Sequence, residues 1–269
     1  MLRLNKKIIT AFSAFTLIFT ICFMNANAQN RKKTQADFYQ IKVYHCTTQA
    51  QINNTEQYLK TAFLPALHKN KISKVGVFKA IDNDTAMDKR IYVFIPSPSL
   101  EKLTSLDEQF FKDRQVRSDG AAYYNLAYNE APYDRIETIL LKSFTGMPHF
   151  VTPPLTAPRT ERVYELRSYE SPTENLHYQK IKMFNEGSEI SIFSRLNFNA
   201  VFYADVIAGC HMPNLMYMTS FNSKADRDEH WKQFSADAEW KKLAVVPEYL
   251  NSVSKHDINL LRPTEYSDF

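Results

Sequence analysis

Short apolar or alternating runs recur along this chain, and between them lie longer segments whose apolar positions follow a helical spacing. Runs of the first kind predict strands and segments of the second kind predict helices. In the first half, strands are predicted at 38–46, 72–81, 90–95 and 135–144, helices at about 52–70 and 99–116, and a short helix at 121–128. The order in this half is therefore strand, helix, strand, strand, helix, strand.

The second half repeats this order. Strands are predicted at 162–170, 198–208, 214–221 and 251–261, with a helix at about 172–194 and one or two more over 223–247. The local signals for a helix start are strong after the first of these strands. Ser171 has the chemistry of an N-cap, Pro172 suits the first helical position, and Glu174 is placed as a capping-box partner.

The two halves also correspond residue by residue. "FYQIKVYH" at 38–45 matches "VYELRSYE" at 163–170, and "IYVFIPSPSLEKL" at 91–103 matches "LMYMTSFNSKADR" at 215–227. Between them, the proline-rich segment 146–160 has little periodicity and is typical of a linker. The sequence therefore predicts two tandem repeats, 36–145 and 161–266, on either side of that linker.

The repeated order βαββαβ is that of the ferredoxin-like unit. Such a unit covers one sheet face with helices and leaves the other face open, and an open apolar face must be covered. Two fused copies cover each other by pressing their sheets together. The predicted fold is therefore α+β, an intrachain dimeric α/β barrel of two tandem ferredoxin-like units packed sheet to sheet.

The first 28 residues have the pattern of a secretory signal peptide. A basic start with Arg3, Lys6 and Lys7 precedes a long apolar run, and Ala26 and Ala28 supply a cleavage site. A transmembrane anchor is the alternative, and the run is near the lower length limit for one. Lipidation at Cys22 is disfavoured because Ile21 stands where a small residue is expected. We therefore expect an exported protein, periplasmic or secreted, without a membrane span after cleavage.

Net charge and cysteine content limit the classes of partner that the sequence predicts. The formal net charge is +4, and the leader carries three positive and no acidic residues, so the mature chain has a net charge near +1. This balance gives no reason to expect nucleic acid as a partner. The mature part keeps Cys46 and Cys210, which could pair or remain as separate buried thiols. A homo-oligomer is compatible with the sequence.

Four motifs in the second half together resemble the NIPSNAP family. They are "VYELRSYE", "SFNSKADRDEHW", "DAEWKKL" and "INLLRP", in the right order over about 162–264. That family is similar to the dimeric α/β-barrel superfamily, and the resemblance implies cofactor-free oxygenase, isomerase or lyase chemistry. One departure is "LMYMTS", where the family often carries His and Trp. The chain has no phosphatase motif, and only five glycines are available for a phosphate loop.

Alternation along the strand 163–170 suggests where chemistry would lie. Tyr164, Leu166 and Ser168 share one face, and Glu165, Arg167 and Tyr169 share the other. We expect the first set to pack under helices and the second to point into the space between the sheets. Glu165, Arg167 and Tyr169 are thus the candidate catalytic residues, and further ligand-binding candidates are Lys42, Tyr44, His45 and Arg262.

Two interpretations of this polar row stay open. In the first, it lines a pocket for a mostly apolar small molecule, with Arg167 binding an oxygen, Glu165 moving a proton and Tyr169 donating a hydrogen bond. In the second, Glu165 and Arg167 form a buried pair that fixes the register of the two halves. The second reading leads to a non-enzymatic interaction module whose interior is only core.

The remaining candidates favour structure over chemistry. His177 and His230 lie on predicted helices, but neither has a second ligand one turn away, so no metal or haem ligand is predicted. Trp231, Phe234 and Trp240 have the spacing of core positions. The sequence predicts neither a metal nor a cofactor, and it leaves open whether the protein is an enzyme.

Overall fold

The computed structural model describes residues 35–269. The predicted signal peptide, with its cleavage site and Cys22, lies outside these residues. Within the described part, no helix is both long enough and apolar enough to cross a membrane. Residues 36–269 form one compact unit.

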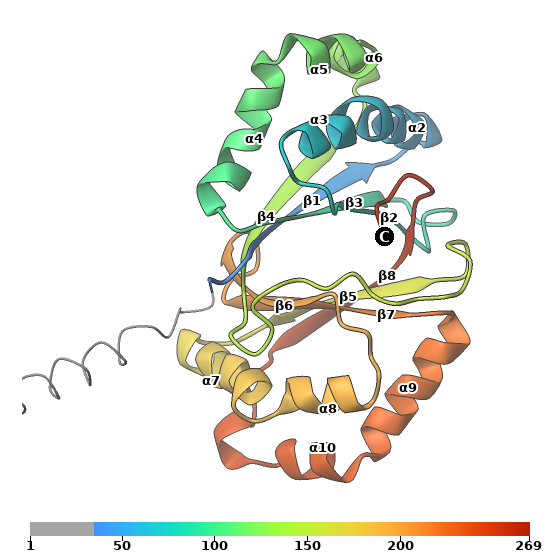
Figure 1. Ribbon diagram of the computed structural model, residues 1–269. Coiled ribbons are helices and arrows are strands. Elements are labelled where there is room, and N and C mark those ends of the chain that lie inside the picture. Colours follow the sequence, from blue (N-terminus) through green and yellow to red (C-terminus); the bar gives the residue numbers. More distant parts are fainter. Residues whose placement is uncertain (1–34) are drawn as a thin grey trace, which may run out of the picture. The chain divides into compact units, whose positions relative to one another are not determined.

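Eight antiparallel strands of the described residues close into a barrel (Figure 1). They are β1 (Phe38–Cys46), β2 (Gly76–Ala80), β3 (Lys89–Ser97), β4 (Arg135–Ser143), β5 (Val163–Glu170), β6 (Phe202–Ala208), β7 (Asn214–Phe221) and β8 (Lys255–Pro263). Their order around the barrel is β1-β3-β2-β8-β5-β7-β6-β4. The four strands of each half are therefore contiguous, and within each half the fourth strand lies beside the first, followed by the third and the second. This confirms the predicted fold class.

Two seams join the halves. At one, β2 pairs with β8, where Lys79 lies opposite Arg262. At the other, β4 pairs with β6, with a shift of register between Leu140 and Leu141. Because both seams are hydrogen-bonded ladders, neither half has a free sheet edge there.

Helices cover the outer faces of the two sheets on opposite sides of the barrel (Figure 1). The first half has α2 (Gln49–Tyr58), a π-helix η1 (Leu59–Phe63), α3 (Leu64–Lys69), α4 (Leu100–Lys112), α5 (Arg114–Asp119), α6 (Ala121–Tyr124) and the 3-10 turn η2 (Tyr128–Glu130). The second half has α7 (Glu174–Asn185), α8 (Glu189–Arg195), α9 (Lys224–Ala236), α10 (Ala238–Leu243) and η3 (Pro247–Tyr249). The predicted helix at 52–70 is thus continuous but contains a π turn.

The predicted helix start at Ser171 was wrong by two residues. Thr173 is the N-cap of α7, and its hydroxyl accepts from the backbone N–H of Leu176, so Glu174 has no capping-box role. The predicted helix 172–194 is also two helices, because the chain turns at Ser188 with a φ of 72°. Two helices replace the predicted 99–116 as well, since the extended Asp113 ends α4 and caps α5.

Aromatic and aliphatic side chains fill most of the barrel interior. Phe94 of β3 stacks on Phe202 of β6, with ring centroids 5.0 Å apart, and Tyr39 packs against both. One end of the barrel is closed: Phe269 lies against Phe78, and Phe150 of the proline-rich segment lies against Phe269. The opposite end, where β1 finishes and β3 and β4 begin, borders a cavity and is called the open end of the barrel.

Candidate functional site

The open end of the barrel contains a small cavity of about 150 Å³ between the two sheets. Most of the residues that line it are inward-pointing strand residues, because every second residue of each strand points inward. The apolar part of the wall consists of Val43, Ile139, Leu166 and Met216. The polar part includes His45, Arg90, Glu137, Asp257 and Asn259. The cavity is thus apolar toward the core and polar toward the opening.

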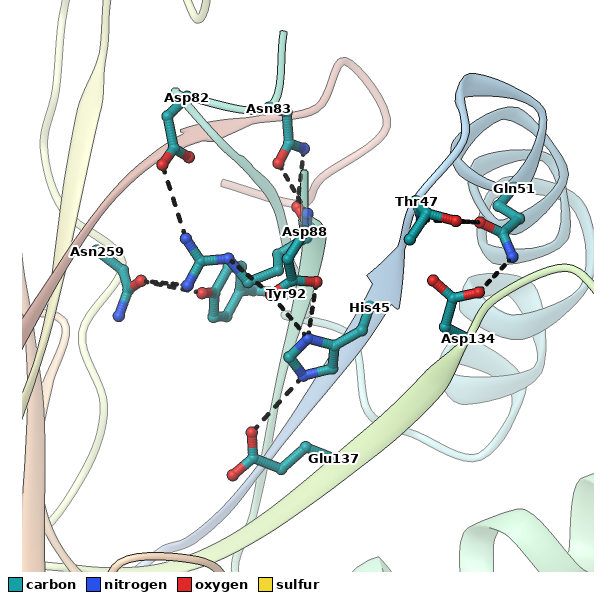
Figure 2. A network of polar contacts seen from close by, with 11 residues as sticks. His45, Thr47, Gln51, Asp82, Asn83, Asp88, Tyr92, Asp134, Glu137 and Asn259 are labelled. Carbon is teal, nitrogen blue, oxygen red and sulfur yellow. Dashed lines mark hydrogen bonds and ion pairs between the residues drawn. The ribbon is translucent and has the colours of Figure 1, made fainter. Parts of the chain in front are cut away.

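His45 lies between two carboxylates at this opening (Figure 2). Its Nδ1 is 3.0 Å and 3.1 Å from the two oxygens of Asp88, and its Nε2 is 3.9 Å from Oε2 of Glu137. A neutral imidazole that donates its Nδ1–H to Asp88 carries its lone pair on Nε2. That nitrogen is then available as a base on the side of Glu137, a residue that also lines the cavity.

Arg90 lies opposite His45 in the β1–β3 ladder and connects the two halves of the chain. Its Nη1 donates a hydrogen bond of 2.8 Å to Oδ1 of Asn259, and the hydroxyl of Tyr92 donates to the same oxygen at 3.1 Å. Asp82 and Asp88 each have an oxygen 3.8 Å from the guanidinium. The Nε–H of Arg90 is buried without a hydrogen-bond acceptor among residues 35–269.

The loop between β2 and β3 holds the two aspartates in place. The side chain of Asn83 accepts from the backbone N–H of Arg90 at 2.7 Å and donates to its carbonyl at 3.0 Å, as Figure 2 shows. These paired bonds tie the loop to β3, so Asp82 and Asp88 approach Arg90 from the loop. The opening therefore has a defined geometry despite being made partly of loop residues.

The predicted catalytic row lies on the opposite side of its strand. Glu165 is fully buried beneath α9, where its carboxylate accepts from Arg227 at 2.6 Å and from the indole Nε1–H of Trp231 at 2.8 Å. Arg167 donates to Glu165 at 2.5 Å and lies 3.6 Å from the Trp231 ring centroid. These groups face the helices, so the prediction that they point between the sheets was wrong.

The row forms a closed polar network. Arg167 donates to the hydroxyl of Tyr169 at 3.1 Å, and this hydroxyl is 2.8 Å from that of Tyr217. Burial by itself raises the pKa of Glu165, but hydrogen bonds from Arg227 and Trp231 and the charges of the two arginines outweigh burial and hold its pKa below the ordinary value. Glu165 and Arg167 are thus a buried pair, but the network joins β5 and β7 to α9 within the second half and does not reach the first half.

Most of the other predicted ligand-binding residues also lie outside the barrel. The ammonium of Lys42 is 2.6 Å from Asp107 on α4. Tyr44 is buried against Tyr133 under the first-half helices, and burial raises its pKa above the ordinary range. Arg262 is exposed at the β2–β8 seam, beside a separate groove of about 610 Å³. His45 is the predicted ligand-binding residue that lies at the cavity.

Burial on both faces of β5 explains the error. In "VYELRSYE" the helix-facing and barrel-facing residues are all shielded, so the pattern contains no polar, solvated face to orient the strand. The inward residues Tyr164 and Leu166 belong to the barrel core. Arg90 and Glu137 were missed, although each is a charged residue at an inward position near the end of its strand.

The helix residues have structural roles. The Nε2 of His177 is 2.8 Å from Asp205, and His230 contacts the backbone carbonyl of Asp226. Phe234 is buried, as predicted for a core position, with Trp240 packed on it. Residues 35–269 contain no group of three or more His, Cys, Asp or Glu side chains that could hold a metal ion. Cys46 and Cys210 are free thiols, the first buried and the second exposed.

Comparison with known proteins supports the resemblance. Residues 164–268 match the NIPSNAP family model. The fold is similar to that of a proposed monooxygenase of Fusobacterium nucleatum (TM-score 0.53, 7% identity, covering 85% of this chain and 92% of that one). It is also similar to a proposed monooxygenase of Lactobacillus acidophilus (TM-score 0.52, 11% identity, 85% and 94%). At these identities the likeness shows the dimeric α/β-barrel fold alone. No curated protein matches the chain.

Proposed function

We propose that the open end of the barrel binds a small, partly apolar organic molecule and that His45 takes a proton from it. The observation that carries this proposal is the Asp88–His45 pair in the wall of a cavity whose floor is apolar. Pockets for small molecules are commonly concave and apolar, with a few polar groups that fix orientation. The similar folds include two proposed monooxygenases, which supports small-molecule binding.

The chemistry follows from the geometry of the pair. Asp88 orients the imidazole by accepting from its Nδ1–H, so Nε2 is the ring nitrogen that accepts a proton from a bound molecule. Proton abstraction is the first step shared by cofactor-free oxygenation, isomerisation and elimination. In this proposal Asp88 is a positioning residue and His45 is the general base. Glu165, Arg167 and Tyr169 do not line this cavity and have no part in the proposal.

The proposal is tested with a panel of small one-ring and short-chain compounds by ligand-observed NMR. We expect binders, and we expect Met216→Trp, which fills the cavity, to abolish their binding. For a binder with an acidic proton, the wild type should catalyse its exchange in D₂O, and His45→Gln should slow that exchange by about 10²-fold or more. If no compound binds, or if Met216→Trp binds as well as the wild type, the cavity is not a ligand site.

A second candidate function is a non-enzymatic interaction module. The filled interior favours it, since Phe94, Phe202 and Tyr39 occupy most of the space between the sheets. Absence of binding in the NMR experiment would favour this candidate.

We also propose that the chain is exported and that residues 1–28 are removed. The support is the basic start, the apolar run and the Ala26-x-Ala28 site of the sequence. N-terminal sequencing of the mature protein from its native source tests this. A chain beginning at Gln29 is expected, and a chain that keeps the apolar run would contradict it.

A further inference from the structure

Carboxylates outnumber cations around the cavity at the open end. Glu137 and Asp257 line it, and Asp82 and Asp88 flank it from the β2–β3 loop. Among the lining residues, all of them in the described part of the chain, Arg90 is the one permanent cation. Lys255 lies 3.2 Å from Asp257 and offsets its charge, so Glu137, Asp82 and Asp88 remain against Arg90. These carboxylates make the local field negative, and such a field disfavours an anionic ligand.

Arg90 is already occupied by groups of the protein. It donates to Asn259, and two carboxylates lie 3.8 Å from its guanidinium. Its positive charge is thus offset before any ligand arrives. Its Nε–H is buried and has no hydrogen-bond acceptor among residues 35–269, and the nearby carboxylate is that of Asp88 at 3.8 Å. The experiment below therefore includes an anionic probe.

Unlike the Arg90 guanidinium, the Glu137 carboxylate is not hydrogen-bonded to other groups in the described part of the chain. Its carboxylate accepts no hydrogen bond from residues 35–269, and the charged or titratable group beside it is the His45 ring at 3.9 Å. The side chain is about a third exposed and lies over the apolar Ile139, one inward position deeper on β4. A carboxylate that accepts no hydrogen bond from the protein and lies beside an apolar wall is suited to a ligand that brings a donor with positive charge.

The volume limits the body of the ligand. A cavity of about 150 Å³ lined by aliphatic side chains accommodates one benzene-sized ring. The cavity here has this volume, with Val43, Leu166 and Met216 in its wall.

We infer that the ligand of this site is a small organic amine, protonated at neutral pH, with an apolar body of about one ring. The ammonium binds the carboxylate of Glu137, and the ring lies against the aliphatic wall. This inference rests on the proposed function, because it names the ligand class of the same cavity. It places the charge of the ligand next to the base His45.

Three probes with the same ring and different charge test it: benzylamine, benzyl alcohol and benzoate. Dissociation constants are measured by NMR titration at pH 7 and low salt. We expect benzylamine to bind about tenfold more tightly than benzyl alcohol, as a charge-assisted hydrogen bond provides, and benzoate to bind most weakly. Glu137→Gln keeps the shape and should remove the preference for the amine while leaving benzyl alcohol binding unchanged.

The outcomes separate the inference from the proposed function. If benzyl alcohol or benzoate binds best, and Met216→Trp abolishes that binding, the cavity is a ligand site but the amine inference is overturned. If Glu137→Gln keeps the preference for benzylamine, the inference is also overturned. If no probe and no other compound binds the wild type, both fail. Circular dichroism confirms that the variants fold, and Ile139→Phe replaces Met216→Trp as the filling variant if the latter does not.

Discussion

Arg90 and Asn259 connect the two halves of the chain inside the barrel through a hydrogen bond of 2.8 Å. They lie on β3 and β8, which flank β2 in the barrel order, so the bond reaches past β2 beside the β2–β8 seam. Tyr92 donates to the same side-chain oxygen of Asn259 at 3.1 Å. This contact defines one wall of the open end, and it holds the halves together independently of the two ladder seams.

Replacing Asn259 should therefore destabilise the barrel more than removing one of its donors. Asn259→Leu leaves both Arg90 and Tyr92 without their acceptor, and we expect a loss of about 2–3 kcal/mol in the free energy of unfolding. Tyr92→Phe removes one neutral donor and should cost about 0.5–1.5 kcal/mol. Chemical denaturation measures both. Equal losses would show that the Arg90–Asn259 bond contributes little.

Glu165 should make the free energy of unfolding depend on pH in the acidic range. Its pKa is lowered in the folded state because hydrogen bonds and charges from Arg227 and Arg167 outweigh the cost of burial. A group with a lowered folded pKa contributes stability above its unfolded pKa, and this is lost as the pH falls through the folded pKa. Glu165→Gln should lose about 3–5 kcal/mol at pH 7, and its difference from wild type should shrink below about pH 4. The measurement is the denaturation free energy from pH 7 to pH 2.

The exposed Glu248 provides the control, since its ion-pair partner among residues 35–269 is Lys182 at the surface. Glu248→Gln should change stability by less than about 1 kcal/mol at any of these pH values. A constant difference between Glu165→Gln and wild type down to pH 2 would contradict the linkage.

The fold was accessible from the sequence because its signals are periodic and repeated. The order of elements and the matching strands of the two halves specify two sheets that must cover each other, and the structure has that arrangement. The sequence does not show which face of a strand points into the barrel and which points to the helices. Alternation separates Leu166 from Arg167 but does not say which one faces helices, because both sides of β5 are shielded from water.

The residues of the site can be identified only when the inward face of each strand is known. His45, Arg90 and Glu137 are separated in sequence by tens of residues and meet only because three strands end at the same opening. Asp88 comes from a loop whose path depends on the side chain of Asn83. Sequence reasoning could have found Arg90 and Glu137 as charged residues near strand ends, but only after the inward side was known.

Lys42 and Asp107 show how the two halves diverged at one position. Asp107 follows the N-cap Ser99 of α4 by eight residues, as Trp231 follows the N-cap Ser223 of α9. Trp231 covers the polar row of the second half, whereas Asp107 neutralises the ammonium of Lys42, whose side chain is 5% exposed.

Removing the two partners of this pair should have unequal effects. Asp107→Ala leaves the buried ammonium of Lys42 without a partner, and we expect a loss of about 1–3 kcal/mol in unfolding free energy. Lys42→Met removes the charge and keeps most of the volume, so it should cost less than about 1.5 kcal/mol. In the double variant, Asp107→Ala should have almost no further effect. A full additive loss there would show that the pair is not coupled.

The two free cysteines should differ sharply in reactivity. Cys46 is fully buried, and burial, followed by the nearby charge of Asp134, raises the pKa of its thiol to about 11. At pH 8 it is therefore protonated as well as inaccessible. Cys210 is exposed and lines the opening of the cavity. Iodoacetamide labelling at pH 8, followed by peptide mass spectrometry, should modify Cys210 rapidly and Cys46 only after unfolding.

The same reaction reports on the site. Because Cys210 lies at the rim of the cavity, a ligand bound there should slow its labelling, while the labelling of Cys46 in the unfolded protein stays unchanged. Saturating benzylamine should therefore protect Cys210 in the wild type and fail to protect it in Met216→Trp, where the cavity is filled. Protection of equal size in both proteins would mean that the amine acts away from the cavity, and fast labelling of Cys46 in the folded protein would contradict its burial.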